Sequence, residues 1–369
     1  MLYRSLGRTG LRVSQLGFGA MRLPMQGEGE AARVDRDLAI PMMHRAFDGG
    51  INYIDTAVMY CNHDSQQAVG EALRGRRDRI IVSTKNHCYG TDEKEWWGNL
   101  ENSLDRLQTD HIDIYNHHGI NWKSYTEQVV PRVGDWMQKA KDQGLIRHIC
   151  TSFHDIPSAL PRLVDAGYVA VITLQYNLLD RRLEDGIAYA HEKGVGVVVM
   201  GPVGGGRLGV RSDVFDGVLP QVKRVPELAL RFVLSNPHVS VALSGMSTMP
   251  QVEENLAVAS DTFSLTEADQ TAIREHLARL ERMAGSYCTG CGYCMPCDSG
   301  VDIPGVFERY NLGRVYGIWN DARKTYRWLQ NNKRSGEMCT ECGACLDKCP
   351  QRLPVPELLK EAHSALSAF

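Results

Sequence analysis

Eight of the eleven cysteines stand in two short runs near the end of the chain. The first run is Cys288, Cys291, Cys294 and Cys297, and the second is Cys339, Cys342, Cys345 and Cys349, followed by Pro350. The second run has the spacing C-x2-C-x2-C-x3-C-P, which is the bacterial pattern for the ligands of a pair of [4Fe–4S] clusters. The residues therefore predict iron–sulfur chemistry, in which electrons move one at a time.

In that pattern, three close thiolates hold one cluster and the fourth cysteine of the run ligates the other cluster. We therefore expect one cluster on Cys288, Cys291, Cys294 and Cys349, and the second on Cys339, Cys342, Cys345 and Cys297. The first run departs from the pattern because its last gap is two residues and Asp298 follows the last cysteine. The alternatives are two four-cysteine zinc sites or a disulfide knot. Zinc sites usually use C-x2–4-C pairs across a longer spacer, so the spacing favours clusters.

The first three-quarters of the chain alternates short apolar runs with longer amphipathic stretches. Eight such runs lie between residues 16 and 258, from Leu16–Ala20 to Val239–Leu243. Eight β-α repeats of this length predict an α/β fold, a parallel (β/α)8 barrel. A doubly wound sheet is the alternative, but the G-x-G-x-x-G that would follow its first strand is missing. We expect Tyr3–Ser14 to form a hairpin that closes the bottom of the barrel.

The domain organisation follows from these two patterns. We expect the barrel to occupy residues 1–283 and a small α-helical, ferredoxin-like domain to occupy residues 284–369. The insert between the cysteine runs, from Val301 to Met338, predicts two helices.

In such a barrel, chemistry sits where the strands end at the C-terminal face. Asp55 ends the second predicted strand and Tyr60 follows in its loop, Lys85 ends the third, and His118 ends the fourth. With the phrases Ile54-Asp55-Thr56-Ala57 and Asp-x-Tyr-x-x-His, this set resembles the aldo-keto reductase family over about residues 1 to 260. The resemblance implies hydride transfer from a nicotinamide to the carbonyl carbon of a small substrate, with Tyr60 supplying the proton.

These four residue types also make chemical sense together. A free tyrosine has a pKa of about 10, which is high for a proton donor near neutrality. We expect the Lys85 ammonium to favour the phenolate and lower the pKa of Tyr60, while Asp55 pairs with Lys85 and holds it. His118 would hydrogen-bond the substrate oxygen. His117 should point the other way on its strand and have a structural role.

The resemblance also implies cofactor contacts. Ser152 and Gln175 match the family's carboxamide ligands, and the glycine-rich loop with Gly201, Gly204 and Gly206 offers backbone N–H groups for a pyrophosphate. Many members place a lysine and an arginine where this chain has Gly245 and Gln251. Neutral hydrogen bonds from Ser247, Gln251 and Asn255 would bind the adenine ribose, so we expect NADP(H) or NAD(H), with the family's habit favouring NADP(H).

Composition narrows the partners. A formal net charge of −3 gives no reason to expect nucleic acid or an anionic membrane as a partner. No apolar run is long enough to span a bilayer. The first fourteen residues carry three arginines and no apolar core, so we expect no signal peptide. Together with the cysteine content, this predicts a cytoplasmic protein whose cysteines bind metal.

The insert between the cysteine runs is basic. From Arg309 to Arg334 there are seven Lys or Arg residues against a single acid, Asp321. One hypothesis is a docking face, including Arg323, Lys324 and Arg327, for an acidic electron carrier such as ferredoxin. The alternative is a solvated helix surface that also offsets the negative charge of the clusters.

The two halves of the chain handle electrons differently, because a nicotinamide gives two as one hydride while a cluster takes them singly. Three functions remain open. The barrel reduces a carbonyl and the clusters are an appendage; the clusters connect a redox reaction in the barrel to an external carrier; or the protein is a non-catalytic electron-transfer or redox-sensing module. The first is favoured narrowly over the second.

Overall fold

The computed structural model describes residues 1–87, 92–209, 212–215, 217–261, 265–283, 288, 290, 292–349 and 352–368. Contacts within the chain divide it into two compact units. The first comprises residues 1–206 and 226–265, and the second comprises residues 207–225 and 266–369. This division differs from the expected boundary at residue 283, because helix α10 (Glu267–Met283) and the segment 207–225 group with the C-terminal region.

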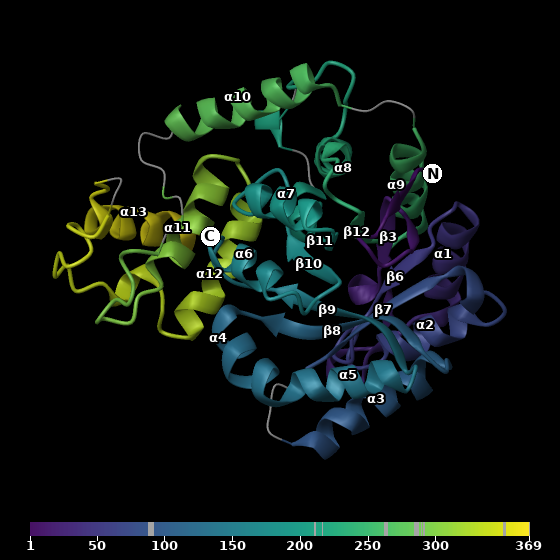
Figure 1. Cartoon of the computed structure of the whole chain (residues 1–369). Helices are drawn as coiled ribbons and strands as arrows, with labels where there is room; N and C mark the ends of the chain where they lie inside the picture. The colour runs from purple at the N-terminus through teal and green to yellow at the C-terminus, as the bar shows by residue number, and fades with distance from the viewer. Residues whose placement is uncertain are drawn as a thin grey trace. The chain divides into compact units, whose positions relative to one another are not determined.

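The first unit contains a closed barrel of eight parallel strands (Figure 1). All eight strands fall where the apolar runs predicted them, so the α/β barrel is confirmed. In order around the barrel they are β3 (Leu16–Gly19), β6 (Tyr53–Asp55), β7 (Ile81–Asn86), β8 (Ile112–Ile120), β9 (Ile146–Phe153), β10 (Val171–Gln175), β11 (Gly196–Met200) and β12 (Val241–Gly245).

Helices connect successive strands of the barrel, and the last helix follows the final strand. They are α1 (Arg36–Asp48), α2 (Ser65–Leu73), α3 (Glu93–Leu107), α4 (Trp122–Ser124), α5 (Gly134–Asp142), α6 (Ala159–Asp165), α7 (Glu184–Glu192), α8 (Val225–Ser235) and α9 (Met249–Ser260). A π-helical segment, Tyr125–Val133, precedes α5 and contains Pro131, whose missing N–H suits a wider turn. No helix in the described part of the chain is both long and apolar enough to cross a membrane.

The N-terminal hairpin forms as expected from β1 (Tyr3–Ser5) and β2 (Arg12–Ser14). It contacts the start of β11, since the N–H of Arg8 donates to the carbonyl of Gly194 at 2.9 Å. A Cβ on Gly7 would lie 2.3 Å from the backbone nitrogen of Gly196, so only glycine allows this approach. Leu6 is fully buried in the same core cluster as residues of six barrel strands. The hairpin therefore covers the N-terminal end of the barrel and leaves the opposite end for chemistry.

The second unit contains three packed helices, α11 (Ile303–Arg314), α12 (Trp319–Asn331) and α13 (Val355–Ser367). The first two are the helices expected between the cysteine runs. The third was not predicted, although its buried residues have helical spacing. They are Val355, Leu358, Leu359, Ala362 and Leu366.

Residues 207–225 belong to the second unit because they bond to α11, α12 and the turn between them. The Ser212 hydroxyl donates to the carbonyl of Tyr316 at 2.8 Å, and Phe215 stacks on the Tyr316 ring. Arg207 forms an ion pair with Asp321, with 3.2 Å between nitrogen and oxygen.

Candidate active site and cysteine pocket

A buried ion pair stands at the C-terminal end of two adjacent strands. The Lys85 ammonium, at the end of β7, donates to Asp55 Oδ1 at 2.5 Å and to the carbonyl of Thr56 at 2.9 Å. Lys85 is 2% exposed and Asp55 is 4% exposed. Burial acts to lower the pKa of Lys85, but the attraction of Asp55 and of Tyr60 raises it above its usual value. Lys85 therefore stays positively charged in the site.

Tyr60 lies over this pair. The Lys85 nitrogen is 4.9 Å from the centroid of the Tyr60 ring. Burial raises the pKa of Tyr60, and this effect outweighs the lowering by Lys85. The expected net lowering of the pKa of Tyr60 is therefore wrong for this structure, because desolvation of a phenolate opposes the nearby cation. The direct consequence is that Tyr60 carries its proton at neutral pH.

Two consecutive histidines on β8 have different surroundings. The ring of His118 meets the ring of Tyr60 edge-on, with 6.2 Å between centroids. Burial, followed by the charge of Lys85, lowers the pKa of His118 to about 4, so its imidazole is neutral. His117 is buried on the other side, where its Nε2 lies 2.9 Å from the Tyr168 hydroxyl. The structure thus brings together Asp55, Tyr60, Lys85 and His118.

The backbone directly after Tyr60 has an unusual conformation. Cys61, Asn62 and His63 have φ angles of 51°, 52° and 67°, and they form the only run of consecutive non-glycine residues with positive φ in the described part of the chain. Each such residue costs on the order of 1–2 kcal/mol. The Asn62 amide donates to the carbonyls of Gly29 and Ala32, at 2.9 and 3.3 Å. These bonds tie the turn to the β4–β5 hairpin (Met25–Gln26 and Arg33–Val34).

A buried chain of hydrogen bonds extends from Asp55 across the barrel. Asp55 Oδ2 accepts from the Ser83 hydroxyl at 2.8 Å, and the Asn116 amide donates to the same hydroxyl at 3.1 Å. The Thr173 hydroxyl donates to the Asn116 oxygen at 3.4 Å. Because all four side chains are at most 4% exposed, this chain fixes the orientation of the Asp55 carboxylate. The sequence reasoning missed it.

The expected carboxamide and pyrophosphate ligands are only partly free for such roles. Ser152 is buried, and its hydroxyl accepts from the N–H of Gly119 at 2.7 Å. Gln175 is exposed at the end of β10. In the glycine-rich loop, the N–H groups of Gly204 and Gly206 donate to the carbonyls of Gly201 and Val203. These two N–H groups are therefore used inside the loop and do not point freely at a phosphate.

The segment after β12 brings together the three predicted adenosine ligands. The N–H of Ser247 donates to the Gln251 side chain at 2.7 Å, and Asn255 donates to the Ser244 hydroxyl at 2.8 Å. The Ser247 hydroxyl donates to the carbonyl of Arg22 at 2.6 Å. These residues form a polar rim beside the glycine-rich loop.

Arg22 is a charged residue at this rim that sequence reasoning did not identify. It follows β3, is exposed, and donates from its guanidinium to the carbonyl of Gly205 at 2.9 Å. A Cβ on Gly245 would lie 3.5 Å from its side chain. Loops after the seventh and eighth strands of a (β/α)8 barrel often bind phosphate, and here these are the loops after β11 and β12. Arg22 therefore supplies a cation where Gly245 and Gln251 are neutral, and the residues fit a dinucleotide.

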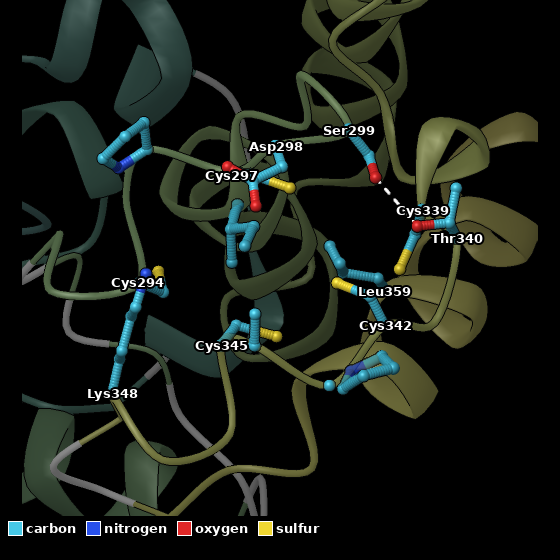
Figure 2. A pocket seen from close by; sticks show the side chains of 15 residues that line it. Cys294, Cys297, Asp298, Ser299, Cys339, Thr340, Cys342, Cys345, Lys348 and Leu359 are labelled. Carbon is cyan, nitrogen blue, oxygen red and sulfur yellow. Dashed lines mark hydrogen bonds between the residues drawn. The ribbon is translucent and has the colours of Figure 1, made fainter.

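In the second unit, cysteines from both runs line one pocket (Figure 2). Cys297, Cys339, Cys342 and Cys345, the expected ligands of one cluster, surround it, and Cys294 and Lys348 also contribute to its lining. It is partly enclosed and partly open to solvent. Burial raises the pKa of the Cys345 thiol, and the neighbouring thiols of the other three raise it further.

Local geometry supports sulfur ligation at this pocket. The N–H of Glu341 donates to Cys339 Sγ at 3.4 Å, and the Ser299 and Thr340 hydroxyls, which join the two cysteine segments, lie 2.8 Å apart. The nine described cysteines are free thiols, so they form no disulfide knot. Among the described residues, no three His, Cys, Asp or Glu side chains converge to hold a single metal ion. Four thiols around a shared pocket fit a multi-iron cluster, whose ligands surround several metal atoms.

The other expected ligand set is less well defined. Cys291 lies outside the described residues. Cys288 and Cys349 are half-buried, and the N–H of Gly290 donates to Cys288 Sγ at 3.4 Å. Cys294, expected in this set, lines the pocket of the first set.

Comparison with known proteins agrees with the geometry of both units. The family model described as "Aldo/keto reductase family" matches residues 15–214, which is more than half of the chain. The chain belongs to the aldo/keto reductase family. As a member it is an oxidoreductase, which removes the purely non-catalytic alternative. A second model, described as a 4Fe-4S dicluster domain, matches residues 287–353.

Relatives cover the aldo/keto reductase part of the chain. L-galactose dehydrogenase from Arabidopsis thaliana is 33% identical, over 75% of this chain and 94% of that protein. The NADH-specific methylglyoxal reductase from Escherichia coli is 28% identical, over 75% of this chain and 98% of that protein. The holo form of an aldo-keto reductase from Bacillus halodurans is 32% identical with a TM-score of 0.64, covering 75% of this chain and 96% of that one.

Proposed function

We propose that this protein reduces the carbonyl group of a small aldehyde, ketone or sugar with NAD(P)H. The bound nicotinamide would supply a hydride to the carbonyl carbon. Tyr60 gives its proton to the carbonyl oxygen, and Lys85 stabilises the phenolate that remains. Asp55 holds Lys85, and the neutral imidazole of His118 hydrogen-bonds the substrate oxygen and orients the carbonyl.

One observation carries this proposal: the buried Asp55–Lys85 pair lies directly beneath a protonated tyrosine. Burying an ion pair gains a protein little stability. Stability alone therefore does not explain a charged lysine that is only 2% exposed. Placed beside a phenol, however, the charge favours the developing phenolate as the proton leaves. The printed activities of the relatives, a sugar dehydrogenase and a methylglyoxal reductase, support a carbonyl or alcohol substrate.

For the cofactor, we propose that both NADPH and NADH bind. The neutral pair Gly245 and Gln251 gives no charge-assisted bond to a 2′-phosphate, while Arg22 offers a cation to any phosphate at the rim.

The direct test is a panel of aldehydes, ketones and aldoses assayed with each nicotinamide, using the wild type and Tyr60→Phe. We expect Tyr60→Phe to lower carbonyl reduction by about 10²- to 10⁴-fold, the usual contribution of a general acid, without changing the dissociation constant of the cofactor. Tyr189→Phe is the matched control, because the Tyr189 hydroxyl bonds to exposed Asp165 and takes no part in the proposed mechanism. Full activity in Tyr60→Phe would exclude this mechanism.

We further propose that the cysteine runs bind two [4Fe–4S] clusters, with Cys297, Cys339, Cys342 and Cys345 on one and Cys288, Cys291, Cys294 and Cys349 on the other. The four-thiol pocket supports the first set, and the dicluster match supports the number. Thiolate ligands persist in a reducing compartment, which supports a cytoplasmic location.

A second candidate function is electron exchange between the clusters and an external carrier such as ferredoxin. The open pocket supports it, since Cys342 is solvent-exposed. EPR of anaerobically purified protein decides between the two. A cluster signal after NADPH or NADH alone would put the clusters on the electron path of the barrel. A signal with dithionite only would leave the barrel as a self-contained carbonyl reductase.

A further inference from the structure

The second unit presents a basic surface at α12. Between Ala322 and Gly336 there are five Lys or Arg residues and no acid. The buried side of α12, with Tyr326 and Leu329, packs in the helical core, so the exposed positions form a stripe on the opposite side. The stripe, called the α12 surface below, continues past the end of the helix and consists of Asn320, Lys324, Arg327, Trp328, Asn331, Lys333 and Arg334.

A tryptophan stands in the middle of these cations. Trp328 is 54% exposed, although a large aromatic ring in a small domain gains by burial. Exposed Trp beside Arg is the composition of binding hot spots, where a partner covers the ring and excludes water around the charges. A helix face that only needed to be soluble would not require an indole here.

Arg323 does not belong to this surface. Its guanidinium lies over the Trp319 ring, 5.2 Å from the centroid, and donates to the carbonyl of Ala365 on α13. Arg323 therefore contributes to helix packing. The docking face expected from the sequence is reduced to Lys324 and Arg327 on the helix, with Lys333 and Arg334 after it.

The α12 surface adjoins the loop that leads out of the cysteine pocket. The N–H of Asp302 donates to the carbonyl of Arg334 at 3.0 Å, and the two side chains form an ion pair at 3.3 Å. Asp302 is five residues after Cys297, and Ser299 between them lines the pocket. The basic end of α12 is therefore bonded to the same short loop that carries a predicted cluster ligand.

We propose that the α12 surface docks a small acidic one-electron carrier protein beside the cysteine pocket. The surface has the opposite charge to such a carrier, an aromatic anchor at its centre and a position next to the thiols. One electron would pass per encounter: the carrier is oxidised by one electron, the cluster is reduced by one, and no proton moves and no bond changes. The inference rests on the proposed clusters and not on the proposed carbonyl reduction.

The test measures binding by calorimetry with the anaerobically purified full chain. The probe is an acidic ferredoxin with two [4Fe–4S] clusters, and basic cytochrome c is the oppositely charged carrier. We expect ferredoxin to bind at an ionic strength of about 0.01 M and to weaken at about 0.15 M, where the Debye length falls from about 30 to about 8 Å. Cytochrome c should not bind under either condition. Equal binding of both carriers, or ferredoxin binding that ignores salt, would overturn the proposal.

Variants test the residues themselves. We expect Lys324→Glu with Arg327→Glu, and separately Trp328→Ala, to weaken ferredoxin binding by about tenfold or more, as loss of charge pairs and a hot spot does. The matched control reverses two exposed lysines of the barrel unit, Lys94→Glu with Lys141→Glu, and should bind as the wild type does. Unchanged affinity in the α12 variants, or equal loss in the control, would refute docking at this surface.

Two further readouts keep the result decisive. Iron content shows whether a variant still folds around its clusters. If a variant loses its iron, the salt dependence of ferredoxin binding and the comparison with cytochrome c, both measured on the wild type, still test the proposal. A single-stranded oligonucleotide tests the other class of partner that a Trp among cations suits; tight binding of it, with none of ferredoxin, would overturn the proposal. Because the readout is binding, a failure of carbonyl reduction would leave the result standing.

Discussion

The ammonium nitrogen of Lys85 lies 4.9 Å from the centre of the Tyr60 ring while it donates to Asp55. Lysine favours the phenolate, and burial favours the phenol by a larger amount. The site therefore holds a proton on Tyr60 at rest and a charge ready to stabilise Tyr60 once that proton is lost. Those are the two properties that a proton donor needs.

Removing the lysine should shift the pH dependence upward. In Lys85→Met, burial acts on Tyr60 without the opposing cation, so the pKa of Tyr60 rises further. Alcohol oxidation needs the phenolate, and its rate should therefore rise at a higher pH than in the wild type. Carbonyl reduction should fall by about tenfold or more, since the developing phenolate loses its stabilisation. Rate profiles in both directions check this, and a midpoint that moved to lower pH would contradict it.

His118 should keep its role well into the acid range. Its pKa in the folded protein is about 4, below the usual value of 6.5, so it becomes protonated only near pH 4. The kcat/KM of reduction should be flat from about pH 7 to about pH 5 and then decline, since histidine loses its neutral form only below that range. His118→Asn should lower the rate and remove the decline. A decline near pH 6.5 in the wild type would show that His118 is solvated.

The buried chain behind Asp55 should influence catalysis without touching substrate. Ser83→Ala removes the hydroxyl that donates to the Asp55 carboxylate, and Asn116→Leu removes the amide that donates to this hydroxyl. We expect each change to lower kcat by about tenfold, in the range found for supporting hydrogen bonds. KM for the carbonyl should not change, and the pH midpoint of alcohol oxidation should move because Lys85 is less well held. Thr173→Val, at the far end of the chain, should have a smaller effect. A change in KM alone would mean that these residues act on the pocket.

Arg22 should hold a phosphate of the cofactor. Arg22→Gln is expected to raise the dissociation constants of NADH and NADPH by about tenfold, the usual worth of one charge-assisted bond. Fluorescence titration measures both, and Arg74→Gln, an exposed arginine bonded to Gln108, is the control. A loss of affinity confined to NADPH would assign Arg22 to the 2′-phosphate. An equal loss for both cofactors would assign it to the pyrophosphate, and unchanged affinity would exclude both contacts.

Substitution of Cys297 should halve the iron content of the protein. Cys297 lines the pocket with the second run, so Cys297→Ser should lower bound iron from about eight to about four atoms per chain if it completes one of two four-iron sites. Cys61→Ser is the matched control, because this half-buried thiol belongs to neither run. Iron analysis with EPR checks the outcome. Wild-type iron content in Cys297→Ser would place the fourth ligand elsewhere.

Patterns that repeat along the chain were predictable from the sequence. Properties that depend on tertiary contacts, such as a pKa set by burial, were not. Strands such as β6 and β7 follow from apolar runs, and the cysteine spacing groups Cys297 with Cys345, which lines the same pocket. The predicted direction of the Tyr60 pKa shift was wrong, because this shift depends on how deeply tertiary packing buries the phenol. Arg22 was missed because its loop meets residue 205 only when the barrel closes. Likewise, the N–H groups of Gly204 and Gly206 pair inside their own loop, which no glycine pattern reveals.

The left-handed turn after Tyr60 links the reaction to a distant part of the chain. Cys61, Asn62 and His63 would relax if nothing held them, and Asn62 is held by the carbonyls of residues 29 and 32. The small hairpin around those carbonyls therefore supports the turn next to Tyr60, the proposed proton donor. We therefore expect substitutions in this hairpin to change turnover through the position of Tyr60.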